Sequence, residues 1–169
     1  MSVSENGMTQ ETITRLIQAA LQVRLNSYAP YSHFQVGAVL LAEDGTIYTG
    51  VNVENASYPA GICAEKTALS KAVSEGQRHF TAIAIVGGHE QENAACLQND
   101  CLPCGVCRQF LSELCPPDMV VITAKSTTDY RIYTLNDLLP FSFSAECWGF
   151  APNPSRDAGL ACRLGRCCC

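Results

Sequence analysis

Two short apolar segments constrain the fold of this chain more than any other feature of its sequence. They are TAIAIVGG (residues 81–88) and MVVITA (residues 119–124), and each is an almost uninterrupted apolar run. Such runs are typical of strands that are buried on both faces of a sheet. Between them lie a polar, turn-like stretch and a short helical pattern that begins at Cys104. A strand–helix–strand unit of this kind predicts parallel strands joined by a right-handed crossover, and therefore an α/β fold.

The periodicity of the preceding residues predicts a helix and a hairpin. Apolar residues recur at helical spacing across residues 9–26, which indicates an amphipathic helix. FQVGAVLLA (residues 34–42) and TIYTGVNVE (residues 46–54) are rich in β-branched residues and flank a turn that contains Asp44-Gly45. The other expected elements are a helix at residues 63–75, a strand-like run at residues 130–134 and a helical turn at residues 134–140 with Thr134 as its N-cap.

Regular periodicity is confined to residues 9–144, which are enough for one domain with its own core. Residues 1–8 and residues 145–169 follow no such period. We therefore expect an N-terminal and a C-terminal extension, the latter mobile. By default, the aromatic side chains of Phe34, Phe141 and Phe143 are expected in the core.

Composition disfavours several classes of protein. The formal net charge is −5 and no run of Lys or Arg forms a basic stripe, so a nucleic-acid partner is disfavoured. The first residues lack the basic and apolar regions of a secretory signal, and no apolar run is long enough to cross a bilayer. We expect a cytoplasmic protein with no membrane partner. In that setting, the eleven cysteines indicate metal binding or catalysis before disulfides.

Two of the expected helices begin with cysteines. Cys63 opens one, and Cys104 and Cys107 form a Cys-x-x-Cys pair at the start of the other. Such a pair places two thiolates close enough to hold one zinc ion, and Cys63 is the candidate third ligand. The helix N-termini would favour the thiolate forms. Three protein ligands leave the fourth position to water, as in catalytic zinc sites, and Glu65 is then the acid–base group beside that water.

Other interpretations of the cysteines stay open. A structural zinc site would use a fourth ligand, which Cys101 could supply, and Cys101 with Cys104 could instead be the gripping pair. A Cys-x-x-Cys pair also occurs in redox motifs. The residues expected to be spectators are Cys96, Cys101, Cys115 and Cys147. The histidines His33, His79 and His89 lack the spacing of a metal-binding helix and are expected to be ordinary surface or loop residues.

Cys-Ala-Glu at residues 63–65 followed by Pro-Cys-x-x-Cys at residues 103–107 resembles the signature of the zinc nucleoside deaminases. Cys rather than His at position 63 is similar to the small homotetrameric cytidine deaminases. The resemblance also includes YSHFQVGAVLL, VNVENASYP, SEG and LLPFSF, and covers most of residues 10–144. It implies a three-layer α/β/α cytidine deaminase-like fold with a mixed central sheet and one zinc ion per chain.

The resemblance further implies a nucleoside aminohydrolase of pyrimidine salvage, which converts cytidine and 2′-deoxycytidine to the uracil nucleosides and ammonia. Glu65 would carry protons between water, ring N3 and the departing amine. A homotetramer with shared active sites is also implied. The implied substrate contacts are Phe34 on the pyrimidine, Asn52 and Glu54 on the ribose 3′-hydroxyl, the backbone of Ala64, the carbonyl of Leu102, and Ala56, Tyr58 and Phe143 reaching neighbouring subunits' sites.

One residue departs from the family pattern, because Lys66 stands where the family usually has Arg. Lys carries the same charge as a point rather than as a planar fork. We expect Lys66 to be a partner of the Cys63 or Cys104 sulfur, with solvation of its side chain as the alternative. Two other functions also stay open: a deaminase of the same fold that acts on nucleic acid or another aminopyrimidine, and a non-catalytic interaction module stabilised by zinc.

Overall fold

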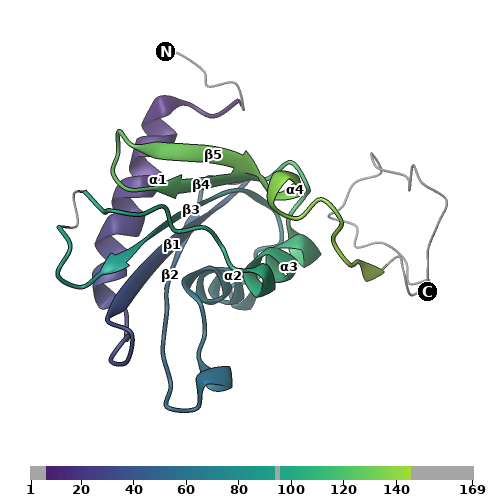
Figure 1. The fold of residues 1–169 in the computed structure, drawn as a ribbon. Coiled ribbons are helices and arrows are strands. Elements are labelled where there is room, and N and C mark those ends of the chain that lie inside the picture. The colour runs from purple at the N-terminus through teal and green to yellow at the C-terminus, as the bar shows by residue number, and fades with distance from the viewer. Residues whose placement is uncertain (1–6, 94–95, 146–169) are drawn as a thin grey trace.

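The computed structural model describes residues 7–93 and 96–145, which form a five-stranded sheet with helices on both faces (Figure 1). The strands lie in the order β2-β1-β3-β4-β5. The strands are β1 (Phe34–Ala42), β2 (Ile47–Val51), β3 (Phe80–His89), β4 (Val120–Ala124) and β5 (Tyr130–Thr134). The α-helices are α1 (Gln10–Val23), α2 (Ala64–Ser74), α3 (Gly105–Leu114) and α4 (Leu135–Leu138), with 3₁₀ turns at Arg24–Asn26 and Tyr58–Ala60.

The crossover predicted from the two apolar segments is present. β3 and β4 are parallel, with Ala82 opposite Val120, and α3 lies between them in the chain. β1 is antiparallel to both β2 and β3, and β5 is antiparallel to β4, so the sheet is mixed. Every position of β4 is buried, as expected of a strand that is covered on both faces.

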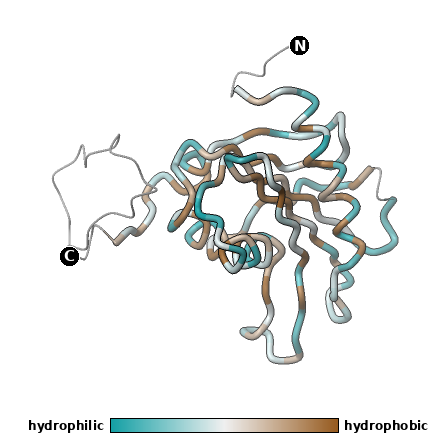
Figure 2. Tube along the Cα trace, turned by 180° about the vertical axis from the view of Figure 1, so that it is seen from behind, coloured by the Kyte–Doolittle hydropathy of each residue, from teal (hydrophilic) through white to brown (hydrophobic). Residues whose placement is uncertain are grey.

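The helices divide between the two faces of the sheet, which gives the three layers (Figure 1). On one side, α1 covers a cluster that includes Leu16, Ala84 and Ile122. On the other side, α2 and α3 cover a second cluster, to which Leu69 and Leu111 belong. The hydrophobic residues follow the strands between these layers (Figure 2). The predicted three-layer α/β/α fold with a mixed sheet is therefore confirmed.

The boundaries of two elements differ from the predicted ones. The helix expected over residues 9–26 is α-helical only to Val23, and its last residues form a 3₁₀ turn. The second hairpin strand stops at Val51 rather than at residue 54. The side chain of Asn52 explains this end, because its Oδ1 accepts a hydrogen bond from Val36 N (2.8 Å) and its Nδ2 donates to Phe34 O (2.9 Å). At this position the side-chain amide of Asn52, rather than another strand residue, forms hydrogen bonds with the backbone of β1.

The end of the domain contains one confirmed cap and one wrong expectation. Thr134 caps α4 in a reciprocal capping box with Asp137, as predicted. Phe141 was expected in the core, but it is 92% exposed. Phe143, for which the family resemblance implies a substrate contact instead of a core position, is 55% exposed. Phe34 is half-buried. None of the helices in the described part of the chain is long and apolar enough to span a membrane.

Helix α2 lies directly against β2 at Gly50. A Cβ on this glycine would be 2.3 Å from the carbonyl oxygen of Ala64 and 2.4 Å from the amide nitrogen of Ala68, far below normal contact distances. The absence of a side chain at Gly50 therefore allows the first turns of α2 to approach the sheet closely. This approach brings the start of α2 next to the start of α3.

Candidate metal centre

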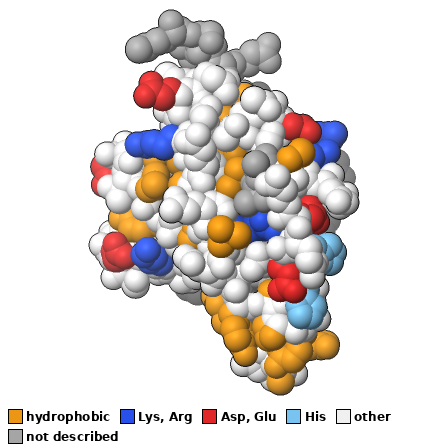
Figure 3. All heavy atoms as spheres, turned by 90° about the vertical axis from the view of Figure 1, so that its left-hand side faces the viewer, with side chains coloured by type: hydrophobic (Ala, Val, Ile, Leu, Met, Phe, Trp, Pro, Cys, Tyr) orange, Lys and Arg blue, Asp and Glu red, His pale blue; other side chains and the backbone are white. Residues whose placement is uncertain are grey.

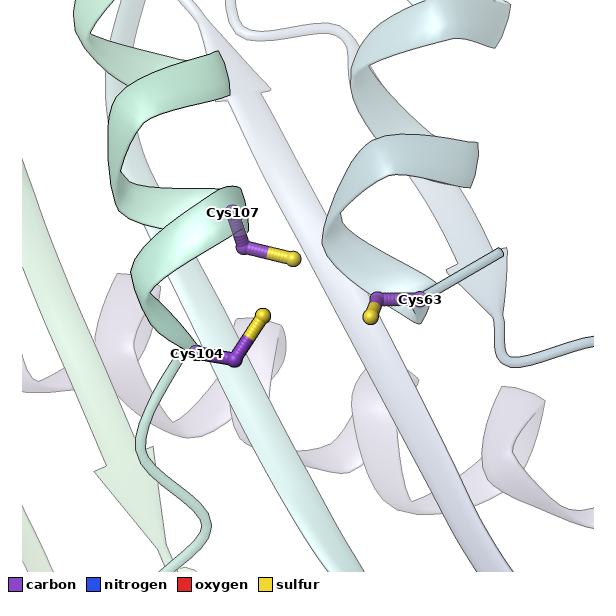
Figure 4. A group of neighbouring side chains, drawn as sticks. All are labelled: Cys63, Cys104 and Cys107. Atoms are coloured by element: carbon purple, nitrogen blue, oxygen red, sulfur yellow. The ribbon is translucent and has the colours of Figure 1, made fainter. Parts of the chain in front are cut away.

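Three cysteine side chains converge where α2 and α3 begin (Figure 4). Cys63 is the N-cap of α2 and Cys104 is the N-cap of α3, while Cys107 lies in the first turn of α3 and is buried. The three sulfur atoms all lie within 4.8 Å of one another, in the one group of three or more potential ligands within the described residues. Two helices that are distant in sequence thus present their thiols to a common point.

The donor set fits a zinc ion. Zinc–sulfur bonds are about 2.3 Å long, so two sulfurs of a tetrahedral site lie about 3.8 Å apart. The observed spacing reaches this value with small side-chain shifts, and three thiolates are ligands that zinc prefers. Cys101 is not a member of the group. The cluster therefore offers three sulfur ligands, the number typical of catalytic zinc sites, rather than four.

The thiols of this group are coupled by hydrogen bonds. The pKa of the Cys63 thiol is lowered to about 6, chiefly by the hydrogen bond from Cys107. Burial alone would raise this pKa, whereas the hydrogen bond with Cys104 and the positive charge of Lys66 lower it further. The pKa of Cys107 is raised, because its thiol donates to Cys63 and is buried. Both helix N-termini also favour negative charge at this point.

Glu65 lies in the first turn of α2 and is only 5% exposed. Burial raises the pKa of its carboxyl above the ordinary value, and the negative charge of Cys63 raises it further. A raised pKa suits a carboxyl that must both accept and donate a proton near neutral pH. Cys63 and Glu65 are two residues apart on one helix, yet both line the same cavity because that cavity lies off the helix end.

This cavity has a volume of about 560 Å³, which is large enough for a small organic molecule. The candidate sulfur ligands Cys63 and Cys104 line it together with Glu65. The predicted substrate contacts in its lining are Asn52, Glu54, Tyr58, Ala64 and Leu102. The predicted contacts Phe34, Ala56 and Phe143, and the predicted sulfur partner Lys66, are not among the lining residues.

Glu54 lines the cavity and is held by hydrogen bonds from a neighbouring loop. Its Oε2 accepts from the backbone N–H groups of Tyr31 (2.9 Å) and Ser32 (3.2 Å), and its Oε1 accepts from the Ser32 hydroxyl. These bonds, the Ser32 hydroxyl first, lower the pKa of the Glu54 carboxyl. Glu54 is therefore an ionised group with a fixed orientation, whereas Asn52 is bonded to β1.

The predicted residues outside the lining have other contacts. The ring of Phe34 packs edge-on against His89, with 5.3 Å between ring centroids. The side-chain amide of Gln109 makes two hydrogen bonds with the backbone of Phe143. Its Nε2 donates to the Phe143 carbonyl oxygen (2.8 Å), and its Oε1 accepts from the Phe143 N–H (3.3 Å). The Lys66 Nζ lies 5.7 Å from the centroid of the Phe110 ring. Lys66 is thus held by an aromatic face while its charge acts on Cys63.

Sequence reasoning missed two features of the site. Cys101 was expected to be a spectator rather than a ligand, and it is not a member of the sulfur group. The sequence did not indicate that it lines the cavity, where burial together with the charges of Glu65 and Cys63 raises its pKa to about 12. The hydroxyl and amides that bind Glu54 come from Tyr31 and Ser32, which directly precede Phe34. Their only signal in the sequence is that they belong to the stretch YSHFQVGAVLL, in which the family resemblance begins.

Fold and site together define a zinc-binding α/β protein with a metal centre of the deaminase type. Residues 10–123 match the family described as cytidine and deoxycytidylate deaminase zinc-binding region. The cytidine deaminase of Halalkalibacterium halodurans is 47% identical over 131 residues, which cover 78% of this chain and 93% of that protein. The chain belongs to the cytidine and deoxycytidylate deaminase zinc-binding family.

Solved structures agree with this assignment. The crystal structure of cytidine deaminase from Burkholderia pseudomallei is similar with a TM-score of 0.69 and 43% identity, over 80% of this chain and 100% of that chain. The cytidine deaminase from Mycobacterium tuberculosis is similar with a TM-score of 0.62 and 37% identity, over 76% of this chain and 94% of that chain. The similarity thus extends over almost the whole length of both neighbours.

Proposed function

We propose that this protein hydrolytically deaminates cytidine and 2′-deoxycytidine to uridine and 2′-deoxyuridine. One observation carries the proposal. Three cysteine sulfurs lie within 4.8 Å of one another at the starts of two helices, and a buried carboxyl with a raised pKa lies beside them. The chain that carries this arrangement belongs to the deaminase family. Three sulfurs leave room for a water molecule, and Glu65 supplies the acid–base group. Such a pair is what hydrolysis of an aromatic amine requires.

In this proposal Glu65 carries the protons. Its carboxylate accepts a proton from the attacking water and delivers it to ring N3 while the C4–O bond forms. It then takes the proton of the new C4 hydroxyl and passes it to the exocyclic amine, so the C4–N bond breaks, the C4=O bond forms and ammonia leaves. A zinc ion held by Cys63, Cys104 and Cys107 would supply Lewis-acid chemistry, which lowers the pKa of a water molecule to about 7. The low exposure of Glu65 keeps competing water away from these transfers.

The cavity walls provide for the rest of the substrate. The backbone of Ala64 and the carbonyl of Leu102 lie in the lining beside Glu65, where they would bind the base and its amine. The ionised Glu54, with Asn52, would bind the ribose 3′-hydroxyl at the other end of the cavity. Phe34 would reach the pyrimidine after a rotation of its half-buried ring away from His89.

We also propose that the active unit is a homotetramer with shared sites. Apolar side chains gather on the segment between β2 and α2, which projects from the rest of the molecule (Figure 1 and Figure 3). Tyr58 is 80% exposed there, and Ala56 is exposed beside it. Phe143 is 55% exposed while Gln109 fixes its backbone. A monomer would leave these side chains in water, whereas neighbouring subunits would bury them against their own cavities.

The proposed setting is pyrimidine salvage in the cytoplasm, where thiols are kept reduced and able to bind zinc. The proposed catalytic domain is residues 9–144. The predicted C-terminal extension at residues 145–169, apart from residue 145, and most of the N-terminal extension lie outside the described residues. We propose that the C-terminal extension is dispensable for the chemistry, which a chain ended at Glu146 would test by retaining its activity.

The test is the loss of cytidine absorbance on incubation with purified protein, before and after treatment with a zinc chelator. We expect turnover that the chelator abolishes and that added zinc restores. A panel of cytidine, 2′-deoxycytidine, free cytosine and cytosine-containing single-stranded DNA separates the substrate classes. No turnover of either nucleoside by the zinc-loaded protein would contradict the proposal, and turnover of DNA alone would favour a nucleic-acid deaminase.

A further inference from the structure

The loop that precedes β1 contains an unusual backbone conformation. His33 has φ = 56°, and it is the only non-glycine residue with positive φ in the described part of the chain. Histidine is one of the non-glycine residues that adopt this left-handed region more readily, whereas a β-branched residue is strongly disfavoured there, so the conformation depends on the residue type at this position. The His33 N–H donates to the carbonyl of Ala29 (3.0 Å), which closes a turn immediately before Phe34 enters the strand.

A second connection holds His33 from the far side. Its carbonyl accepts a hydrogen bond from the N–H of Glu90 (3.0 Å), and its Nδ1 lies 3.2 Å from Glu90 Oε1. Glu90 is the first residue after β3, so backbone and side chain both connect the loop to the end of the neighbouring strand. Two contacts from one residue fix the orientation of His33 more firmly than the exposed ion pair alone would.

The turn at His33 determines where the preceding amide groups point. The N–H groups of Tyr31 and Ser32 and the Ser32 hydroxyl all donate to Glu54, and that hydroxyl accepts from Phe34 N at 3.0 Å. The charge of His33 is also one of the causes that lower the pKa of Glu54. The loop thus connects a residue pair outside the cavity to a carboxylate inside it.

We propose that His33 and Glu90 are positioning residues, which hold the loop of residues 29–33 so that Glu54 is preorganised for the ribose 3′-hydroxyl. The inference rests on the proposed function, because it takes Glu54 to be a ribose contact. Neither residue is in the lining of the cavity, so both act through Glu54. Their effect depends on the 3′-hydroxyl and leaves the chemistry at C4 unchanged.

The chain offers matched controls for both residues. His33 directly precedes β1 and Glu90 directly follows β3; at the opposite end of the same strands, His79 directly precedes β3 and Glu43 directly follows β1. All four are exposed. His79 lacks the positive φ of His33. The test variants are therefore Glu90→Gln and His33→Val, with Glu43→Gln and His79→Val as controls.

The first measurement is kcat/KM for cytidine and for 3′-deoxycytidine, which lacks the group that Glu54 would bind. For cytidine, we expect KM to rise about two- to fivefold in Glu90→Gln, the size that an exposed ion pair supports. A β-branched side chain is strongly disfavoured at positive φ, so His33→Val should raise KM about tenfold. In both variants kcat and the kcat/KM for 3′-deoxycytidine should match the parent, and the controls should match it for both substrates.

The second measurement, amide hydrogen exchange of Tyr31 and Ser32 in the zinc-loaded protein, does not depend on activity. We expect faster exchange in Glu90→Gln and His33→Val but not in the controls. Equal losses for the two substrates, or unchanged exchange at both amides, would overturn the inference. If the parent fails to deaminate cytidine, the proposed function fails, and the exchange experiment still decides whether His33 and Glu90 hold the loop that binds Glu54.

Discussion

The two ends of the cavity are built in different ways. The metal end consists of helix starts that are packed on the sheet, with Cys107 and Glu65 buried and Gly50 in contact with the α2 backbone. The recognition end consists of loops, in which Glu54 and Asn52 are oriented by hydrogen bonds and Tyr58 is 80% exposed. At the metal end packing determines geometry, whereas at the recognition end hydrogen bonds and exposed side chains do.

This difference fits the role that we propose for each end. Proton transfer and metal binding need fixed distances and a low exposure to water, which a packed core supplies. Binding of a nucleoside needs access, and loops provide access at the cost of rigidity. The comparison predicts that changes at the metal end affect kcat and zinc binding, whereas changes at the recognition end affect KM and substrate choice.

The largest effect is expected at Glu65. Glu65→Gln keeps the shape of the side chain but cannot carry protons, so kcat should fall by at least about 10²–10⁴-fold, the range for general acid–base catalysis. Zinc content and the unfolding midpoint should stay close to those of the parent. Steady-state kinetics and metal analysis measure both, and Glu75→Gln at the other end of α2 is the control. A Gln variant that retains most of its activity would remove Glu65 from the mechanism.

The metal end could be predicted from the sequence because its determinants are local. Cys63 and Cys104 lie at N-caps, and the spacing of Cys104 and Cys107 alone places two thiols on one helical turn. The strands were also predictable to within a few residues, since buried strands produce continuous apolar runs. What the spacing could not predict is that Cys101 would line the cavity without joining the sulfur group.

The next effect tests whether packing positions the metal end. In Gly50→Ala, the new Cβ would lie 2.3 Å from Ala64 O, so α2 must move away from the sheet. We expect a loss of about 1–3 kcal/mol in the free energy of unfolding, the usual cost of overpacking, and weaker zinc binding because Cys63 moves with α2. Chemical denaturation and competition with a colorimetric chelator measure the two effects.

Gly37→Ala is the matched control, since its Cβ would lie 2.3 Å from Ala20 O on the α1 side of the sheet. We expect a similar loss of stability with zinc affinity retained. If Gly50→Ala binds zinc as tightly as the parent, or if Gly37→Ala loses zinc equally, packing against β2 does not position the metal ligands.

A smaller effect is expected for a phosphate at the recognition end. Glu54 is ionised because its hydrogen bonds, that of Ser32 first, lower its pKa. A 5′-phosphate near this carboxylate would be repelled by about 1–3 kcal/mol at surface dielectric values, so kcat/KM for cytidine monophosphate should be about 10–100-fold below that for cytidine. Glu54→Gln should narrow this difference while it weakens cytidine binding. Equal values for both substrates in the parent protein would contradict the assignment of Glu54 to the ribose.

The recognition end was harder to predict because its determinants are distant in sequence. Glu54 is oriented by residues more than twenty positions earlier, and His33 is supported by Glu90 on another strand end. The exposed Phe141 was assigned to the core because an apolar side chain alone does not distinguish a core position from an exposed one. The periodicity of a single sequence indicates which face of a helix or strand is buried. It carries no information about contacts between residues that are distant in the sequence.

The smallest effect is expected at Lys66, which lies at the metal end but outside the cavity lining. Its ammonium lies 5.7 Å from the Phe110 ring centroid and lowers the pKa of Cys63, so it offsets part of the negative charge that three thiolates place around the metal. Lys66→Gln should retain zinc and lower kcat about two- to fivefold with KM unchanged, whereas Lys66→Arg should match the parent, because only the charge is lost in the first variant. Lys71→Gln, in the last turn of the same helix, controls for a change in net charge. Steady-state kinetics and metal analysis measure these effects. A Lys66→Gln variant with the kcat of the parent would mean that the Lys66 side chain is only solvated. A rise in KM instead of a fall in kcat would contradict the division of roles between the two ends of the cavity.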